Sequence, residues 1–350
     1  MRQVFKIDPL RDDRWARLVA RHPRSSIFHT AEWLSALQRT YGYEPISFTT
    51  SPPGRELESG LVFCEIESWL TGRRLVALPF SDHCEPLVNS AEELDVLILA
   101  AERHRVARAS HYLELRTTAS GAGVAHGRTS KNYLLHRLDL TPPVAEISSN
   151  LHRDCIQRKI RRATRDQIVC RDDRPDVLLA SFYRLLVLTR RRHGLPPQPF
   201  SWFRNLIEVM GNRLNIAVAY KNDVPIAAIL TLTHSGTIVY KYGCSDTRFN
   251  TSGATQLLLW RMILQAKQTG QAVIDFGRSD ISAAGLIKFK ERWGSSCTPL
   301  TYLRVGESRQ PVHHAFTKPQ WLGRAMRFSV EHAPTRVLSA ASELIYRHAG

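Results

Sequence analysis

Acidic and basic residues that can act in group transfer gather in one stretch of the chain, between Tyr240 and Gly294. Asp246 follows one expected strand, Asp280 follows another, and Lys290 comes ten residues later. Transfer of an acyl group to an amine needs a base that takes the amine proton and a cation that holds the charge of the adduct. We therefore predict this chemistry for the stretch, with either Asp246 or Asp280 as the base.

Other groups in the stretch suit the donor and the leaving group. Lys290 is predicted to stabilise charge on the donor or the adduct, and Tyr242 to protonate the leaving group. Gly253 and Ala254 open a long expected helix, whose first N–H groups can hold a phosphate, and Arg248 adds positive charge. The predicted donor- and substrate-binding set is completed by Lys241, Arg278 and Trp293.

The loop after the second strand has a structural alternative. Asp275 is expected to pair with Arg278 or to cap the loop, and Arg278 is expected to orient Asp280. An Asp–Arg pair that only fixes the turn explains the same residues. Further on, residues 286, 289 and 293 share one face of a short helix that must pack inward, which leaves Lys290 at the rim.

A basic helix is expected from about Ser148 to Arg165. Its residues Arg158, Arg161 and Arg162 are predicted to contact a polyanion. The partners that fit are tRNA, the acidic face of an acyl carrier protein, or a lipid-linked diphosphate. The whole chain carries a formal net charge of +16, which favours such partners, although a basic solvated surface is the alternative.

These groups must be positioned by an α/β fold. Helices are expected at 11–20, 31–40, 91–109, 181–193, 202–210 and 252–270, and strands at 44–49, 58–67, 73–78, 112–116, 132–138, 214–220, 226–233, 237–242 and 272–276. Thr141-Pro142-Pro143 is the best break, because two prolines cannot continue a strand ladder. We predict domains at 1–141 and 144–308 and a helical tail at 309–350, with helices at 318–330 and 335–348.

Composition sets the outer limits. The 350 residues are 43% apolar and 23% charged, which suits two globular domains and argues against disorder. Six scattered cysteines and fourteen histidines show no metal-ligand spacing, so no metal site is predicted. No signal peptide and no spanning segment is expected, which predicts a cytoplasmic protein, or one peripheral to the inner face of a membrane.

Taken together, three segments resemble the FemAB-like and BioF2-like branch of the GNAT N-acyltransferase superfamily. They are Lys241-Tyr242-Gly243 with Ser245-Asp246, then Phe276 to Asp280, then Gly285-Leu286 with Phe289-Lys290 and Trp293-Gly294. The basic segment 158–163 and the entry segment 28–33 resemble the family as well. The pyrophosphate loop departs from the family pattern, with one glycine where two are usual, and no helical hairpin arm is found.

The resemblance implies two tandem GNAT-like domains, no permanently bound cofactor, and an acyl-CoA or aminoacyl-tRNA as co-substrate. It implies acyl or aminoacyl transfer to the amine of a small-molecule or lipid-linked acceptor, of the kind used in cell-envelope or exopolysaccharide biosynthesis. The donor stays open between acyl-CoA, an acyl carrier protein and tRNA. The alternative reading is a non-catalytic basic module that binds RNA or an anionic envelope lipid.

Overall fold

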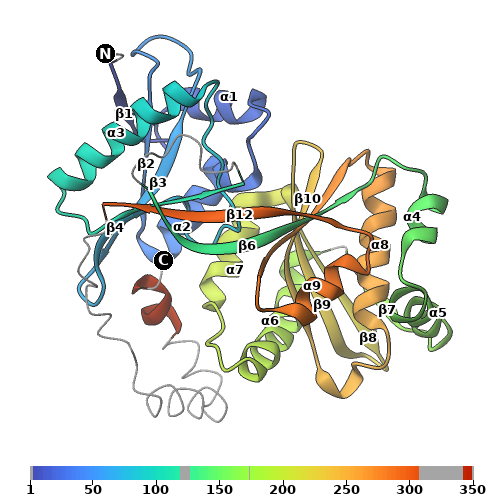
Figure 1. The fold of residues 1–350 in the computed structure, drawn as a ribbon. Helices are drawn as coiled ribbons and strands as arrows, with labels where there is room; N and C mark the ends of the chain where they lie inside the picture. Colours follow the sequence, from blue (N-terminus) through green and yellow to red (C-terminus); the bar gives the residue numbers. More distant parts are fainter. Residues whose placement is uncertain (1–2, 119–126, 173, 307–341, 349–350) are drawn as a thin grey trace. The chain divides into compact units, whose positions relative to one another are not determined.

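The computed structural model of the chain describes residues 3–118, 127–172, 174–306 and 342–348 (Figure 1). These residues divide into two units. Unit 1 holds residues up to Tyr133, with Pro299 onward and the last described helical turns, and unit 2 holds Leu134–Thr298. The division therefore falls inside strands β6 (Arg128–Asp139) and β12 (Ser296–Val305). The domain bounds at Pro142-Pro143 stay a prediction.

Unit 1 is an α/β unit with strands in the order β1-β2-β3-β4-β5-β12. Neighbouring strands run antiparallel, except that β4 and β5 are parallel. Its elements are β1 (Phe5–Ile7), α1 (Asp13–Arg21), the 3₁₀ turn η1 (Ile27–His29), α2 (Ala31–Tyr41), β2 (Glu44–Thr49), β3 (Leu61–Ser68), β4 (Gly72–Val76), α3 (Ala91–Ala107) and β5 (Leu113–Thr117).

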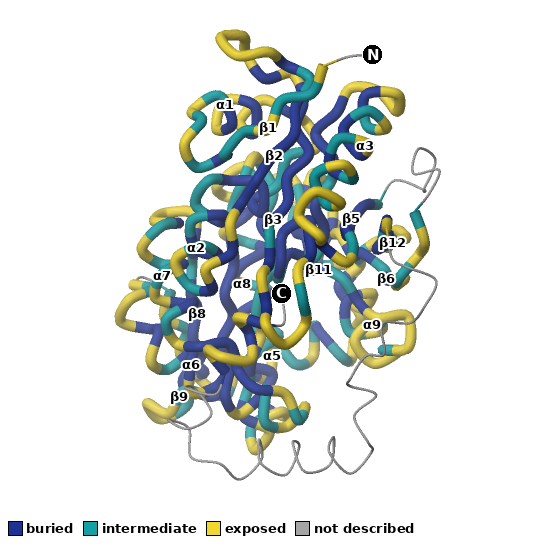
Figure 2. The backbone as a smooth tube through the Cα atoms, turned by 90° about the vertical axis from the view of Figure 1, so that its left-hand side faces the viewer, coloured by how far each residue is buried: buried dark blue, intermediate teal, exposed yellow. Residues whose placement is uncertain are grey.

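Local sequence explains these boundaries. Thr30 caps α2 as expected, because its side chain accepts the N–H of Trp33, and Gly42 ends the helix in the left-handed conformation. Strand β2 is buried from its second residue onward and appears dark blue in Figure 2. Burial on both faces indicates a central strand covered by helices.

Strand β5 is tied to β12 by charge as well as by backbone pairing. Thr301 to Val305 pair antiparallel with Thr117 to Leu113. The buried carboxylate of Glu114 accepts from Arg116 of its own strand at 3.0 Å and from Arg304 of β12 at 3.0 Å. A buried carboxylate needs such partners, so β12 completes the polar pairing of unit 1.

Unit 2 has its strands in the order β6-β11-β10-β9-β8-β7. The strands β8, β9 and β10 form the expected antiparallel meander. Its further elements are α4 (Val144–Asn150), the π turn η2 (Arg153–Gln157), α5 (Arg158–Arg165), β7 (Val169–Arg171), α6 (Pro175–Arg192), α7 (Phe200–Met210), η3 (Gly211–Arg213), β8 (Leu214–Lys221), β9 (Val224–His234), β10 (Thr237–Ser245), η4 (Thr247–Phe249), α8 (Ala254–Gln268), β11 (Val273–Asp280) and α9 (Ala284–Glu291).

Helices cover both faces of this meander. Ala217, Ile229 and Ile238 pack in one core cluster with Leu258 and Met262 of α8, and α5 packs on α8. Helix α6 contacts the same strands β8, β9 and β10. Because successive side chains of a strand point to opposite faces, α8 and α6 lie on opposite sides of the strands.

Two expectations about elements need correction. The basic helix expected over 148–165 is broken, because Leu151 is extended and His152 caps the separate π turn. Strands β1, β7 and β12 were not predicted from the sequence.

The C-terminal expectations are tested only in part. The expected helix 318–330 lies outside the described residues, whereas 342–348 is helical. In this helix the apolar side chains of Leu344 and Ile345 are exposed.

Candidate active site

The most distinctive backbone feature of unit 2 is the separation of two parallel strands. Their register joins Thr237 with Val273 through Val239 with Asp275, and no further pair joins β10 to β11 over their described lengths. A bulge between Tyr240 and Tyr242 follows in β10, whose later residues pair with β9. A strand that bulges away from a parallel neighbour leaves an opening beside backbone groups.

Gly243 directly follows this bulge. A side-chain carbon at Gly243 would clash with the Tyr240 hydroxyl, so the glycine leaves room for the Tyr240 side chain. Burial raises the pKa of Tyr240, which keeps its hydroxyl protonated. The Tyr-Lys-Tyr-Gly sequence is therefore explained by packing at the bulge.

A hollow of about 310 Å³ opens at the start of α8. Its lining combines the first turn of the helix with the ends of β9 and β10, and includes Lys159 and Phe289. The first helical bond runs from the Leu257 N–H to the Gly253 carbonyl. The N–H groups of Ala254, Thr255 and Gln256 therefore precede the helical ladder, and such groups suit an anion. We call this hollow the donor pocket.

Gly253 has a different role from the expected one. Its φ of +81° is left-handed, and a side-chain carbon there would lie 2.2 Å from the carbonyl oxygen of Lys159. The glycine thus admits the backbone of α5, rather than the backbone of a ligand. Ala254 does line the donor pocket, and its N–H donates to the Ser252 hydroxyl at 3.2 Å.

Asp246 is held by Arg248. The carboxylate is 5% exposed, caps the turn η4, and accepts from the guanidinium in a contact of 2.6 Å. This hydrogen bond lowers the pKa of Asp246, with backbone bonding and charge acting the same way. A carboxylate with a lowered pKa is a weaker base, so the geometry disfavours Asp246 as the proton acceptor. Arg248 is correspondingly engaged with Asp246.

The two aspartates of β11 differ. Asp275 is buried and caps the loop, since it accepts the Gly277 N–H at 2.7 Å, and it lies 3.6 Å from the guanidinium of Arg137. Asp280 is exposed at the strand end and accepts both the N–H and the hydroxyl of Ser282, at 2.9 and 2.6 Å. Asp280 therefore offers the more accessible carboxylate.

Lys290 is buried rather than at the rim. Only 3% of it is exposed, and its ammonium donates to the carbonyls of Gly277 and Arg278 at 2.8 and 2.9 Å. Conversely, Leu286, which was expected to face inward, is 45% exposed. The last turn of α9 thus places a cation against the backbone of the last residues of β11, where Arg278 lies.

Sequence reasoning overlooked the histidine beside this cation. His136 of β6 is fully buried, and neither ring nitrogen has a hydrogen-bond partner among the described residues. Burial and, to a smaller extent, the charge of Lys290 lower the pKa of His136 to about 4, although the charge of Asp275 opposes the shift. Its imidazole is therefore neutral at pH 7. The histidines had been considered from the sequence only as possible metal ligands.

Three predicted residues lie in packed surroundings. The Tyr242 hydroxyl accepts from the indole N–H of Trp202 at 3.0 Å, and its ring packs on Phe203. The ammonium of Lys241 lies 5.9 Å from the Tyr242 ring centre. Trp293 is fully buried in the core cluster, which disfavours its predicted contact with the donor.

The predicted polyanion contacts come together. Arg158, Arg161 and Arg162 line one hollow of about 840 Å³ on α5, beside the start of α8. The remaining lining residues are Arg153, Asp154, Lys159, Arg165, Asn250 and Thr251. Six basic side chains and one acidic side chain therefore line this hollow, which we call the basic hollow. Lys159 and Asn250 line both this hollow and the donor pocket, so the two are neighbours.

The structure therefore groups only part of the predicted set. Ala254 lines the donor pocket and the three arginines line the basic hollow, while Asp246, Asp280 and Lys290 line neither. The contributions of Thr255, Gln256, Lys159 and Phe289 were missed. Thr255 and Gln256 could have been predicted, because they follow Ala254 in the first turn of the expected helix and their N–H groups are free of the helical ladder.

Among the described residues, no group of three or more His, Cys, Asp or Glu side chains is placed to hold a metal ion. In the same part of the chain, no helix has the length and apolar character needed to cross a membrane.

The two units share the tandem α/β fold of GNAT proteins. Residues 151–290 match the family model described as an acetyltransferase (GNAT) domain. The matched segment contains the donor pocket, the basic hollow and Lys290. A GNAT domain uses an acyl-CoA as co-substrate rather than a resident cofactor. No curated protein matches the sequence.

Solved structures support the same fold. FemX is 13% identical, with a TM-score of 0.66 over 85% of this chain and 96% of that chain. The C-terminal domain of a putative lysylphosphatidylglycerol synthetase from Agrobacterium fabrum is 14% identical, with a TM-score of 0.57 over 85% and 91%. A tandem GNAT protein from the clavulanic acid pathway is 11% identical, with a TM-score of 0.53 over 88% and 99%. The predicted resemblance to FemAB-like GNAT proteins is confirmed at the level of fold.

Proposed function

We propose that the protein transfers an acyl or aminoacyl group from an anionic donor to the amine of a cell-envelope or polysaccharide precursor. The observation that carries the proposal is the donor pocket at the start of α8, next to the opening between β10 and β11. In this proposal the donor phosphates accept from the N–H groups of Thr255 and Gln256. The acyl group then lies in the opening, beside backbone groups of β10.

Roles for the remaining residues follow from their placement. Asp280 takes the amine proton, since it is the exposed carboxylate of β11. Lys290 acts through the loop backbone, because its charge is held against the carbonyls of Gly277 and Arg278. The similarity in fold to a putative lysylphosphatidylglycerol synthetase domain favours a lipid-linked acceptor, which would bring the protein to a membrane surface.

The donor pocket can be tested by removing one N–H. Thr255→Pro deletes a first-turn donor at a position where a helix tolerates proline. We expect coenzyme A to bind roughly tenfold more weakly, since a hydrogen bond to a charged group contributes about 1.5–3 kcal/mol. Calorimetric titration measures this. Glu92→Pro, at the equivalent position of α3, is the matched control and leaves the affinity unchanged.

A turnover assay distinguishes the proposed transferase from a non-catalytic binding module. The protein is incubated with acetyl-CoA and, separately, with charged tRNA, together with amino sugars, amino acids and lipid-linked amines, and products are followed by mass spectrometry. An N-acylated product that Asp280→Asn lowers roughly a hundredfold supports the proposal. The basic hollow favours a non-catalytic module that binds RNA or anionic lipid as the second candidate. Tight, salt-dependent binding of RNA or lipid without any product would establish that candidate instead.

A further inference from the structure

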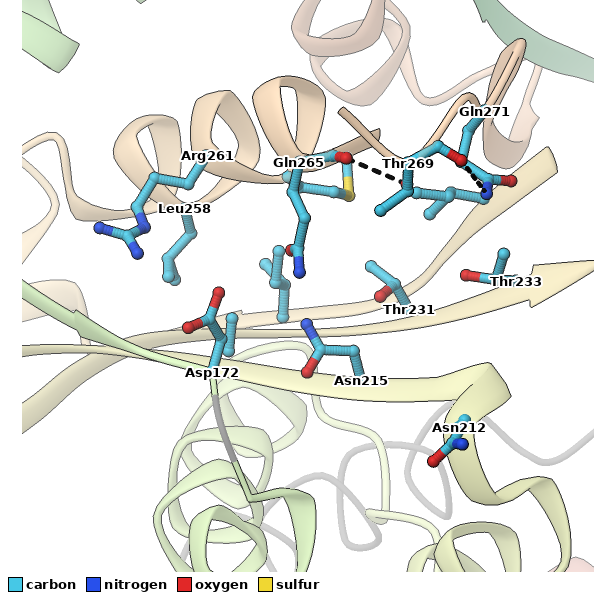
Figure 3. Close-up of a pocket in the computed structure, with 14 residues that line it drawn as sticks. Asp172, Asn212, Asn215, Thr231, Thr233, Leu258, Arg261, Gln265, Thr269 and Gln271 are labelled. Atoms are coloured by element: carbon cyan, nitrogen blue, oxygen red, sulfur yellow. Dashed lines mark hydrogen bonds between the residues drawn. The ribbon is translucent and has the colours of Figure 1, made fainter. Parts of the chain in front are cut away.

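A separate hollow of about 270 Å³ lies in unit 2 between helix α8 and strands β8 and β9 (Figure 3). On α8 it is lined by residues of the later turns, from Leu258 to Gln265, and it shares no residue with the donor pocket. Its volume lies just below the usual range for binding pockets, so it suits only a small ligand. It is therefore a second cavity on the same helix.

The floor and the roof of this hollow are partly apolar. Ala217 and Ile229 supply the strand side, and Leu258 and Met262 supply the helix side. Alanine at position 217 leaves space that a larger side chain would fill. The small side chain of Ala217 therefore contributes space to the hollow below α8.

Amides and hydroxyls face one another across the middle of the hollow. Asn215 points up from β8 and Gln265 points down from α8, with Thr231 of β9 beside them (Figure 3). Among the described residues, neither the Asn215 nor the Gln265 amide is hydrogen-bonded to the protein. Each amide offers both a donor and an acceptor, which suits a polar uncharged group.

Two side chains of opposite charge lie at one end of the hollow. Asp172 and Arg261 both reach this end of the hollow in Figure 3, and among the described residues neither forms a hydrogen bond or an ion pair. Burial raises the pKa of the Cys170 thiol to about 11, and the charges of Arg261 and Asp172 act on it in opposite directions, so both lie near this side chain. One carboxylate and one guanidinium can thus meet a ligand that carries both charges.

We propose that this hollow binds a free α-amino acid with a polar, uncharged side chain. Its carboxylate accepts from Arg261, its ammonium donates to Asp172, and its side chain lies between Asn215 and Gln265. Two opposite charges favour a zwitterion over a neutral sugar, and the paired amides favour a polar side chain over an aliphatic one. This inference goes beyond the proposed transferase function and does not depend on it.

The test uses the full-length protein without acyl donor. L-Glutamine is titrated calorimetrically, beside N-acetyl-L-glutamine, which lacks the ammonium, L-glutamine methyl ester, which lacks the carboxylate, and L-norleucine, which lacks the amide. We expect L-glutamine to bind with a Kd below ~1 mM. Each analogue should bind at least tenfold more weakly.

Variants connect each preference to its residue. Asp172→Asn should abolish the preference for L-glutamine over its N-acetyl form, and Arg261→Gln the preference over the methyl ester. Gln265→Leu should reduce the preference over L-norleucine. Asp176→Asn, an exposed acid on α6, is the control and should change none of these. The proposal is overturned if L-glutamine does not bind saturably, if it binds no more tightly than its three analogues, or if the Asp172 and Arg261 variants bind as the parent does.

Discussion

At the scale of single residues, Lys290 shows how burial changes an expected role. A lysine at the rim of a site could be removed without loss of stability, but this ammonium is enclosed and satisfies two carbonyls. Its loss would leave the oxygens of Gly277 and Arg278 buried and short of a donor. The sequence pattern put the lysine beside an apolar face but could not show that the chain folds over it.

We therefore predict that Lys290→Ala lowers both stability and turnover. The free energy of unfolding should fall by about 1–3 kcal/mol, the cost of unsatisfied buried polar groups. Turnover per folded molecule should fall roughly a hundredfold. Urea unfolding and steady-state kinetics measure the two effects. Lys288→Ala, on the exposed side of the same helix, should change neither, and a stable Lys290→Ala protein would contradict the buried placement.

His136 makes a prediction about pH. Its pKa in the folded protein is about 4, below the ordinary value of 6.5, because burial and the charge of Lys290 disfavour the imidazolium. The unfolded chain therefore binds more protons between these values, and the folded state loses stability as the pH falls from 6.5 to 4. The slope contributed is at most about 1.4 kcal/mol per pH unit.

His136→Leu should flatten that slope and cost little stability at pH 7, since it replaces an unpartnered buried ring by an apolar side chain. Chemical unfolding at several pH values measures this. His111→Leu, at an exposed position, is the control and should keep the parent slope. An unchanged slope in the His136 variant would mean that the imidazole is solvated in the folded protein.

At the scale of elements, the contact between α5 and α8 depends on Gly253. Gly253→Ala should destabilise the protein by more than 1 kcal/mol, roughly the cost of a left-handed alanine, because its side chain also meets the Lys159 carbonyl. Gly270→Ala is a matched control. Gly270 has a φ of +70° with nothing within 4 Å, so that variant measures conformational strain alone. The difference in thermal stability between the two variants gives the contribution of the contact between α5 and α8. Equal losses of stability in both variants would contradict this contribution.

Helix α5 also carries the charge prediction. Exchange of Arg158, Arg161 and Arg162 for Glu should weaken binding of the polyanionic partner and flatten its dependence on salt, since fewer counterions are released. The same exchange at exposed Arg11, Arg24 and Arg55 of unit 1 is the control. Binding isotherms at several salt concentrations measure the slopes. Equal slopes for the parent and the α5 variant would mean that α5 is a solvated face.

Elements with clear local signals could be predicted from the sequence, and those held by distant partners could not. Strand β2 was predicted at its observed bounds, and α2 was found through its Thr30 cap. Strand β12 was missed because Pro299 interrupts it and its pairing partner β5 lies far away in the sequence. The break at Leu151 was missed because buried apolar residues, Ile147, Leu151 and Ile156, continue across it at nearly helical spacing.

The same contrast between local signals and distant partners applies to the candidate site. The three arginines share one helix face, so their grouping could be predicted. The burial of Lys290 and His136 depends on packing between β6, β11 and α9, which spacing along the chain does not show. The partner of Gly253 was likewise invisible, because the carbonyl of Lys159 comes from a segment almost a hundred residues earlier.

At the scale of the whole molecule, the placement of β12 governs the order in which the protein can be made. The ribosome completes β5 early, but the strand that pairs with it emerges only after residues 118–298. At roughly 5–20 residues per second, the nascent N-terminal part waits about ten seconds or longer with one sheet edge open and Glu114 short of Arg304. An open edge invites pairing with other chains. This part of the protein should therefore depend on chaperones during synthesis, and a chain released at Thr298 should aggregate.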